Sequence, residues 1–269
     1  MKIGNREFPL GEKSYVMGIL NVTPDSFSDG GKFNQIDAAL KHAEEMIRDG
    51  ADVIDIGGES TRPGYTKISD EEETDRVVPV IEAVKKEFGI PISVDTYKSG
   101  VAEAAAQAGA DLINDIWGLK YDPHMSEVIA KSGLACCLMH NRDNTEYRNF
   151  MEDMKQDLRE TIALAKAAGI ADDKIILDPG VGFAKSYENN LEVIRRLKEF
   201  NELKYPVLLG TSRKSVIGLT LDLPAAERVE GTIVTTVMAV EAGCMFVRVH
   251  DVKENHRAIQ MAEAILDRK

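Results

Sequence analysis

The sequence predicts an α/β protein built as a (β/α)8 TIM barrel with a short N-terminal hairpin, and three observations carry this prediction. Short apolar runs alternate with longer amphipathic stretches, which indicates parallel strands joined by right-handed helical crossovers. Eight such units fit within the 269 residues, as a closed barrel requires. Each apolar run turns polar at its carboxyl end, which is the side on which barrels bind ligands.

The elements can be placed in order along the chain. A hairpin is expected in residues 1–13, where Gly4-Asn5 and Pro9-Leu-Gly11 are turn signals around a short alternation, and it could plug one end of the fold. Strands are expected at 15–20, 51–56, 91–95, 110–114, 134–138, 174–178, 206–210 and 244–249. Helical patterns between them begin near Ile36 and end at Gly50, and recur at 71–88, 99–108, 153–168, 189–200, 225–242 and 254–268.

One junction recurs and supports a repeating architecture. A helix end, a glycine, a short link and a buried strand occur in residues 48–57 and 106–115, and more faintly in 240–248. No break in composition suggests a second domain, so residues 1–269 are expected to form one barrel domain. A doubly wound open sheet remains the alternative, because a pattern of elements does not reveal whether the sheet closes.

Composition excludes several classes of protein. A net charge of −12 argues against a general affinity for nucleic acid or an anionic membrane, since either needs a basic face. No apolar run approaches the roughly 18 residues of a membrane span, and the first residues lack a signal-peptide pattern. The adjacent Cys136 and Cys137 lie in an apolar run and are expected to be buried thiols of the core. A cytoplasmic enzyme is therefore expected.

The carboxyl ends of the predicted strands form the expected functional rim. Polar residues occupy all of these ends, in segments 21–31, 57–64, 93–96, 114–115, 139–140, 178–185, 209–215 and 248–251. Turn polarity or helix capping would explain any one of them. The complete set indicates an active site.

Five of these residues suit a flat heterocycle. Asp95, Asn114 and Asp178 sit at the inner edges of strand ends, where a buried carboxylate requires a partner. They could perform acid–base chemistry, bind a metal, or accept hydrogen bonds from ring N–H groups. In the last case Lys214 would donate to a ring carbonyl and Arg248 would stack on the ring.

A second group has the composition of a phosphate or diphosphate pocket. Thr61, Ser212, Arg248 and His250 combine hydroxyls with cations, and barrels commonly bind phosphate after the last two strands. Asn21 beside a diphosphate would be an oxygen ligand for Mg2+, which prefers substrate phosphates and few protein groups.

Two features are interpreted as structural. His140 is expected to be a hydrogen-bonded histidine with no part in the chemistry. The glycine-rich segment 178–182 resembles no Walker or dinucleotide motif, and its glycines are expected to let the backbone approach a ligand closely.

These motifs resemble those of the dihydropteroate synthase family, which are pterin-binding TIM barrels. The most specific matches are Asn21-Val-Thr-Pro-Asp-Ser-Phe-Ser-Asp-Gly-Gly31, Gly57-Gly-Glu-Ser-Thr-Arg-Pro-Gly64 and Gly210-Thr-Ser-Arg-Lys-Ser215. Shorter matches lie at 93–96, 114–115, 178–183 and 248–251. The resemblance implies condensation of 6-hydroxymethyl-7,8-dihydropterin diphosphate with p-aminobenzoate, giving 7,8-dihydropteroate and diphosphate. It also implies Mg2+ as cofactor, a homodimer, and sensitivity to sulfonamides.

Residue roles follow from the resemblance. The pterin would be bound by Asp95, Asn114, Asp178 and Lys214, lined by Met139, Phe183 and Gly210, and stacked on Arg248. The diphosphate would contact Thr61, Arg248 and His250, with Ser212 added by the residue types, and Mg2+ would contact Asn21. The p-aminobenzoate site would comprise Phe27, Arg62, Pro63, Lys214 and Ser215. The catalytic residues would be Asp25, Lys214, Arg248 and His250.

The implied chemistry is dissociative. Diphosphate leaves first, and the aniline nitrogen traps a cationic pterin methylene, with Asp25 helping to stabilise the developing cation. The long loops after the first two strands would exclude water. One departure from the family pattern is Asn141-Arg-Asp-Asn144 after His140, which leaves the role of residues 141–150 open.

Two alternatives remain. A pterin-dependent methyltransferase serving a corrinoid protein would share the pterin aspartates, but it has no use for a diphosphate pocket or for Arg62-Pro63. A non-catalytic pterin-binding barrel would keep the fold without the chemistry. The retained cations and hydroxyls favour the synthase.

Overall fold

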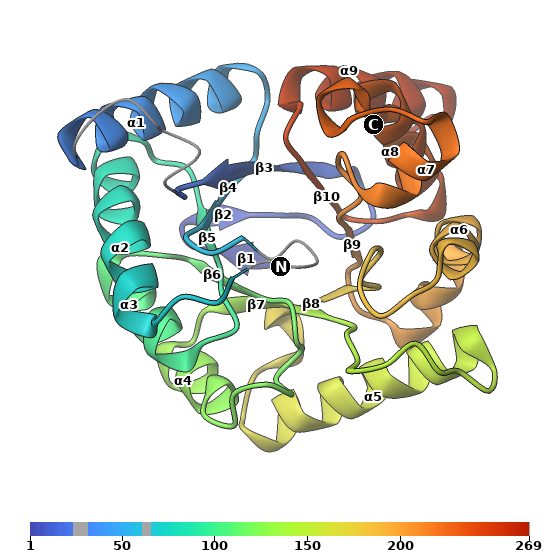
Figure 1. The fold of residues 1–269 in the computed structure, drawn as a ribbon, viewed down its shortest axis with the longest axis horizontal. Coiled ribbons are helices and arrows are strands. Elements are labelled where there is room, and N and C mark those ends of the chain that lie inside the picture. The colour runs from blue at the N-terminus through green and yellow to red at the C-terminus, as the bar shows by residue number, and fades with distance from the viewer. Residues whose placement is uncertain (24–31, 61–65, 269) are drawn as a thin grey trace.

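The protein is a closed ring of parallel strands surrounded by helices (Figure 1). The computed structural model describes residues 1–23, 32–60 and 66–268, and the side chains of residues 32–34 are not among those described. The strands of the ring are β3 (Tyr15–Asn21), β4 (Val53–Gly57), β5 (Ile92–Asp95), β6 (Leu112–Asp115), β7 (Ala135–Met139), β8 (Ile175–Asp178), β9 (Leu208–Leu209) and β10 (Phe246–Val249).

Strand order shows that the sheet closes. All neighbours pair in parallel in the order β8-β7-β6-β5-β4-β3-β10-β9. A parallel bridge joins Leu177 to Val207, and the Leu177 amide donates to the carbonyl of Pro206 at 2.9 Å. These contacts connect β8 to the strand at the other end of the order. The predicted TIM barrel is confirmed, and the open-sheet alternative is wrong.

Helices pack around the outside of the ring (Figure 1). They are α1 (Lys32–Arg48), α2 (Asp70–Glu87), α3 (Ser99–Ala108), α4 (Met125–Ser132), α5 (Phe150–Ala167), α6 (Tyr187–Arg195), α7 (Ser215–Leu221), α8 (Val229–Ala242) and α9 (Val252–Ile265). The pattern at 189–200 is α6 followed by a 3-10 helix over Leu197–Leu203, and the pattern at 225–242 is a 3-10 turn followed by α8. Helices α4 and α7 had no predicted bounds. They are eight and seven residues long, too short to show a clear helical period.

The N-terminal hairpin closes one end of the barrel. Strands β1 (Lys2–Ile3) and β2 (Arg6–Glu7) pair antiparallel, as predicted. Ile3 and Phe8 are fully buried, and the Phe8 ring lies 4.9 Å from Tyr15 and 5.5 Å from Phe246. These residues belong to the cluster that fills the barrel interior. The hairpin therefore acts as a plug.

The interior of the barrel changes character along its length. Alternate residues of a strand point to opposite faces, so the inward positions can be followed at intervals of two. On β7, Cys136 packs towards the helices and Cys137 into the interior, and both are fully buried, which confirms the prediction that they are core residues. Val53 and Leu112 are apolar residues that face the interior. Asp55 and Asn114 follow them by two positions and face the same way. A polar floor therefore begins at the carboxyl ends of the strands.

Candidate active site

A cavity of about 790 Å3 lies above this polar floor. Its walls include nine predicted site residues: Asn21, Asp95, Phe183, Gly210, Ser212, Lys214, Ser215, Arg248 and His250. They come from elements far apart in the sequence and converge because all the strands run in the same direction. These parts of the predicted rim therefore border one cavity.

Arg248 is fixed across the floor by two carboxylates. Its Nε donates to Asp55 Oδ2 at 2.5 Å, and its terminal nitrogen donates to Asp95 Oδ2 at 2.6 Å. Asn114 also donates from Nδ2 to Asp55 Oδ2, at 3.3 Å. Asp55 is fully buried on β4. The guanidinium is thereby held at its edge by charge-assisted hydrogen bonds, which fixes the orientation of its plane.

Sequence reasoning missed Asp55. The predicted site consists of polar residues that follow each apolar run, whereas Asp55 lies inside the run Val53–Gly57. The sequence did carry a sign of its role. Asp55 is a carboxylate among apolar residues, two positions after the inward-facing Val53, so it also faces the interior of the barrel. A buried carboxylate requires a cation or donors near it, and Arg248 was available at the end of another strand.

Three buried acceptors of the floor have no hydrogen-bond partner among the described residues. They are Asp55 Oδ1, Ser93 Oγ and Asp95 Oδ1. Buried polar atoms are nearly always paired, so unpaired ones mark a place where a ligand or water completes the site. Burial raises the pKa of Asp95 to about 7, against the opposing effect of the Arg248 charge. The arrangement suits a ligand that brings N–H donors.

Asp178 lies opposite these residues and is also buried. Its Oδ1 accepts a hydrogen bond from the Gly180 amide at 2.7 Å, and burial raises the pKa of its carboxyl. A Cβ at Gly210 would lie 3.5 Å from Asp178 Oδ2 and 3.9 Å from Arg248 Cβ. Glycine at 210 therefore keeps open the space between the acidic group and the guanidinium, as its predicted lining role requires.

Lys214 and Phe183 form one wall. The Lys214 ammonium lies 4.6 Å from the centroid of the Phe183 ring and donates to the Val181 carbonyl. Burial lowers the pKa of Lys214 to about 8. Phe183 packs on the same cluster as Met139, so the two residues predicted to line a pterin slot are brought together. The wall therefore combines the aromatic face of Phe183 with the Lys214 amine, a hydrogen-bond donor that can gain or lose its proton near neutral pH.

Ser212 contacts His250 and fixes its ring. The Ser212 hydroxyl oxygen accepts from the His250 amide at 3.1 Å and lies 2.9 Å from His250 Nδ1. When the hydroxyl donates its proton to Nδ1, the ring proton is on Nε2; when Nδ1 carries the proton, the hydroxyl accepts it. Arg213 pairs instead with Asp251, through a 3.0 Å contact from its Nε. The pair Ser212–His250 lies where an anionic group was predicted.

Asn21 is the predicted metal ligand. It ends β3 and lines the cavity, and a Cβ at Gly57 would lie 3.9 Å from its Oδ1 and 3.8 Å from Asp95 Oδ2. The amide oxygen is therefore on the Asp95 side of the cavity. Among the residues that the structure describes, no three His, Cys, Asp or Glu side chains form a metal cluster. A hard amide oxygen fits Mg2+ that is held mainly by substrate phosphates.

Five predicted site residues lie outside the described residues: Asp25, Phe27, Thr61, Arg62 and Pro63. The described residues on either side of 61–65 form a buried network that sequence reasoning missed. Glu59 accepts from Tyr97 at 2.5 Å, from Lys98 at 2.8 Å and from the Ile68 amide at 2.9 Å. Residues before and after this segment are therefore tied to the same side chain.

The fold and the site together define a class of protein. A closed barrel carries, at the carboxyl ends of its strands, buried acceptors for ring N–H groups beside an oriented guanidinium and a histidine. The class is a TIM-barrel enzyme for a flat heterocycle that bears an anionic group.

Comparison with known proteins identifies the family. Residues 17–250 match the family described as pterin binding enzyme, and the chain belongs to this family. The dihydropteroate synthase of Clostridium beijerinckii is 62% identical over 269 residues, covering 100% of both chains. The described residues contain no helix with the length and apolar character of a membrane span.

Solved structures of dihydropteroate synthases have the same fold as this chain. The dihydropteroate synthase of Clostridium difficile in the presence of pteroic acid is 53% identical, with a TM-score of 0.95 over 98% of this chain and 100% of that one. The dihydropteroate synthase of Xanthomonas albilineans with 4-aminobenzoic acid is 40% identical, with a TM-score of 0.91 over 95% of this chain and 94% of that one.

Proposed function

We propose that this chain is a dihydropteroate synthase, which condenses 6-hydroxymethyl-7,8-dihydropterin diphosphate with p-aminobenzoate to give 7,8-dihydropteroate and diphosphate. The observation that carries the proposal is the cavity floor, where unpaired buried acceptors surround a guanidinium fixed by Asp55 and Asp95. Full-length similarity to dihydropteroate synthases supports it.

The pterin ring is assigned to the floor and the wall. Asp95 Oδ1, Asp178 and Asn114 offer the acceptors and the donor that match the ring N–H groups and ring nitrogens. Lys214 donates to the ring carbonyl, and Arg248 lies against the ring face. Gly210 leaves the slot open between them.

The diphosphate is assigned to the Ser212–His250 side of the cavity, with Arg248 between the two substrate parts. In the tautomer that accepts from Ser212 at Nδ1, His250 would donate its Nε2 proton to a phosphate oxygen, while Arg248 contributes fixed positive charge. Mg2+ near Asn21 would neutralise charge that develops on the leaving diphosphate. The predicted contact from Thr61 lies outside the described residues.

The p-aminobenzoate carboxylate is assigned to Ser215, which borders the same cavity as Lys214. Phe27, Arg62 and Pro63 would complete this site from outside the described residues. If the assignment is right, Ser215→Ala raises the KM for p-aminobenzoate more than the KM for the pterin diphosphate. An equal rise in both constants would contradict it.

The chemical role of the chain is to bind, orient and exclude water. The C–O bond to the diphosphate breaks first, and Arg248 and His250 stabilise the charge on the departing oxygens because they are already oriented. The pterin methylene, now cationic, accepts the lone pair of the aniline nitrogen, which then loses a proton. Asp25 would help to stabilise the cation. No side chain forms a covalent bond with substrate.

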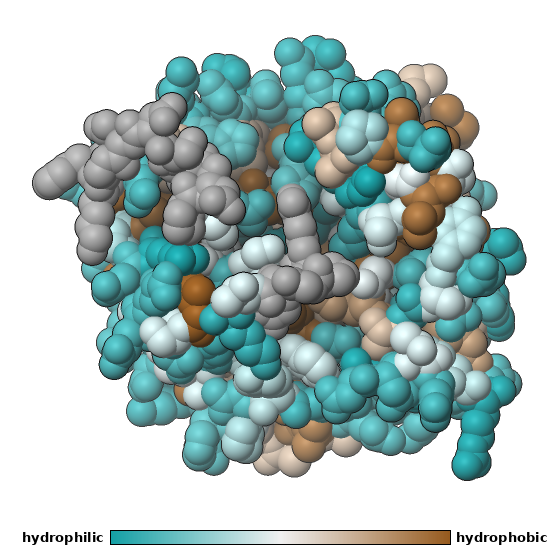
Figure 2. Space-filling model, in the orientation of Figure 1, coloured by the Kyte–Doolittle hydropathy of each residue, from teal (hydrophilic) through white to brown (hydrophobic). Residues whose placement is uncertain are grey.

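A second copy of the chain is the proposed partner. Leu219, Leu221, Val234 and Val237 on α7 and α8 are 68%, 44%, 60% and 38% exposed. Apolar residues gather in Figure 2 at the α7–α8 corner, whose place is seen in Figure 1. Apolar surface of this kind is typical of an interface. Light scattering should give a dimer mass, which Val234→Glu converts to a monomer mass; a monomeric wild type would contradict this.

A cytoplasmic location is proposed with the same function. Cys136, Cys137 and Cys244 are free and buried, and burial raises the pKa of each thiol. Unpaired thiols are typical of proteins from reducing compartments.

The test of function is product formation by the purified chain. Incubation with dihydropterin diphosphate, p-aminobenzoate and Mg2+ should give 7,8-dihydropteroate, identified by its mass. A sulfonamide should inhibit competitively with p-aminobenzoate. Absence of dihydropteroate from a folded preparation would overturn the proposal.

A further inference from the structure

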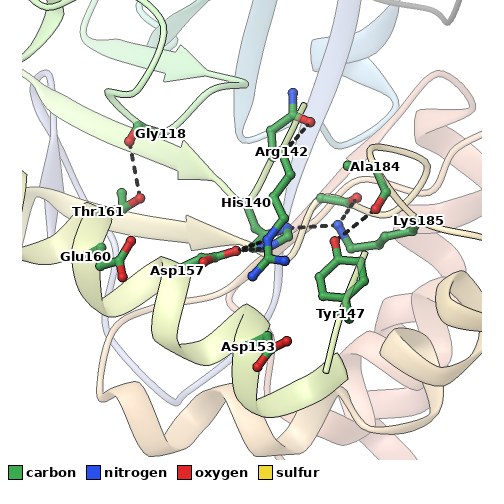
Figure 3. A network of polar contacts seen from close by, with 12 residues as sticks. Gly118, His140, Arg142, Tyr147, Asp153, Asp157, Glu160, Thr161, Ala184 and Lys185 are labelled. Carbon is green, nitrogen blue, oxygen red and sulfur yellow. Dashed lines mark hydrogen bonds and ion pairs between the residues drawn. The ribbon is translucent and has the colours of Figure 1, made fainter. Parts of the chain in front are cut away.

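A chain of polar contacts joins Arg142, Asp157, His140 and Lys185 (Figure 3), none of which lines the cavity. Arg142 Nε donates to Asp157 Oδ2 at 2.5 Å, and His140 Nε2 lies 2.9 Å from the same oxygen. On the other side of the ring, His140 Nδ1 lies 3.0 Å from Lys185 Nζ. His140 is buried and hydrogen-bonded, as predicted. The four side chains come from the segment after β7, from α5 and from the loop after β8.

Counting donors and acceptors fixes the protons of this chain. Lys185 also donates to the carbonyl of Gly180 at 2.9 Å and to that of Phe183 at 2.9 Å. In its charged form Lys185 has three N–H donors and no acceptor, so with His140 Nδ1 as its third acceptor it is satisfied. His140 is then neutral, with its proton on Nε2 and directed at Asp157. Burial lowers the pKa of His140 to about 4, which agrees with a neutral ring.

Lys185 thereby fastens the loop that carries Phe183. The two carbonyls that it binds, at Gly180 and Phe183, flank Val181, whose own carbonyl accepts from Lys214. Two further contacts hold the same loop: Tyr147 Oη donates to Ala184 O at 2.9 Å, and the Gly182 amide donates to Asn190 Oδ1 at 2.6 Å. The position of the Phe183 ring and of the Lys214 ammonium therefore depends on a loop whose carbonyls converge on one cation.

Holding this cation in the protein interior has a free-energy cost. Burial lowers the pKa of Lys185 to about 7, with Lys214 and Arg142 acting in the same direction and Asp178 and Asp157 opposing. A lysine pKa below its unfolded value means that folding disfavours the charged form. An apolar side chain of similar length would avoid this cost, although it could not bind the carbonyls.

We propose that Lys185 is a positioning residue of the pterin slot, which acts through the loop carbonyls to place Phe183 and Lys214, and that Arg142 and Asp157 support it through His140. The proposal rests on the proposed function. It also gives a role to Arg142, which lies in the segment that departs from the family pattern.

The experiment compares Lys185→Met, Lys185→Arg and Arg142→Met with the wild type. Lys131→Met is the matched control, since the Lys131 side chain is 84% exposed and lies on α4, away from the cavity. Steady-state kinetics give separate KM values for dihydropterin diphosphate and p-aminobenzoate, and thermal unfolding gives the midpoint. The fluorescence of Trp117, the only tryptophan, reports on the cluster against which Phe183 packs.

A displaced slot wall should weaken pterin binding. Lys185→Met is expected to raise the KM for dihydropterin diphosphate about 10- to 100-fold, as small misplacements in a site commonly do. The KM for p-aminobenzoate should change less, Trp117 emission should shift, and the midpoint should stay near that of the wild type. Lys185→Arg should show a smaller rise, because the cation is kept with a different geometry. Lys131→Met should match the wild type throughout.

The outcomes separate this inference from the function on which it rests. An unchanged KM for dihydropterin diphosphate in Lys185→Met would overturn the inference, whether or not the midpoint falls, because a purely structural role lowers the amount of active enzyme without changing KM. If Lys185→Met does not fold, Arg142→Met decides: a raised KM for the pterin substrate supports the inference and an unchanged one overturns it. A wild type that forms no dihydropteroate would instead contradict the proposed function.

Discussion

Arg248 Nε and Asp55 Oδ2 lie 2.5 Å apart although 193 residues separate them in the chain. Strands β4 and β10 are not neighbours, since β3 lies between them, so the contact crosses the floor of the barrel. Asp95 holds the other side of the same guanidinium from β5. The orientation of the group proposed to stack on the pterin is therefore fixed before substrate binds, and catalysis gains from such preorganisation.

Asp55→Asn tests this relationship. The amide keeps the shape of the carboxylate and removes its charge, so Arg248 loses one of two fixing partners. We expect kcat/KM for dihydropterin diphosphate to fall about 10- to 100-fold, in line with the loss of precise positioning. Asp49→Asn, in the Arg48–Asp49 pair at the end of α1, is the control and should behave as the wild type. Wild-type kinetics in Asp55→Asn would show that Asp95 alone fixes the guanidinium.

Asp95 should make stability depend on pH. Its pKa is raised to about 7 by burial in the folded protein, whereas the unfolded chain has the ordinary aspartate value near 4. Between these values the folded state binds more protons, so this contribution to stability is complete below about pH 4 and is lost as the pH rises through about 7. Urea unfolding of wild type and Asp95→Asn at pH 5 and pH 8 measures it.

The expected result is a difference between the two proteins that shifts with pH. The wild type should lose unfolding free energy relative to Asp95→Asn as the pH rises from 5 to 8. A constant difference over that interval would show that Asp95 stays ionised throughout.

Ser212→Ala tests the His250 tautomer. Without the hydroxyl, Nδ1 loses its donor and the proton is no longer confined to Nε2. Inhibition by free diphosphate should weaken roughly 10-fold, because a charge-assisted hydrogen bond contributes about 1.5–3 kcal/mol. The KM for p-aminobenzoate should be unchanged. Equal loss of both affinities would mean that Ser212 supports the whole loop.

Asp178→Ala tests the acceptor opposite Arg248. A buried ring N–H pair would lose its acceptor, and leaving such groups unpaired is costly. Titration calorimetry with a pterin should show no measurable binding, while the circular dichroism spectrum stays that of a folded barrel. Tight pterin binding by this variant would remove Asp178 from the site.

Much of the fold could be predicted because the alternation of apolar strands and amphipathic helices is visible in short stretches of the sequence. The runs at 51–56 and 110–114 each follow a glycine, and the structure places β4 and β6 there with a shift of two residues at their starts. The count of eight units indicated a closed barrel, but the contact that closes it, between Leu177 and Val207, has no local signature in the sequence. The helix α7 was missed because its seven residues complete only about two turns.

Some residues of the site could be predicted from the sequence and others could not. Asp95, Asn114 and Asp178 could be found because they end apolar runs, and the structure brings them to one cavity floor. Asp55 lies in the middle of such a run, and Glu59 and Lys98 reveal their pairing only when β4 and β5 are side by side. The sequence pattern therefore does not show which side chains of different strands pair with one another.

The most direct test measures diphosphate release from dihydropterin diphosphate in the presence of Mg2+, with and without p-aminobenzoate. The proposed function predicts one diphosphate released for each 7,8-dihydropteroate formed when p-aminobenzoate is present, and loss of turnover when EDTA removes the metal. Tight binding of the pterin with no release under either condition would contradict it and would point to a binding protein.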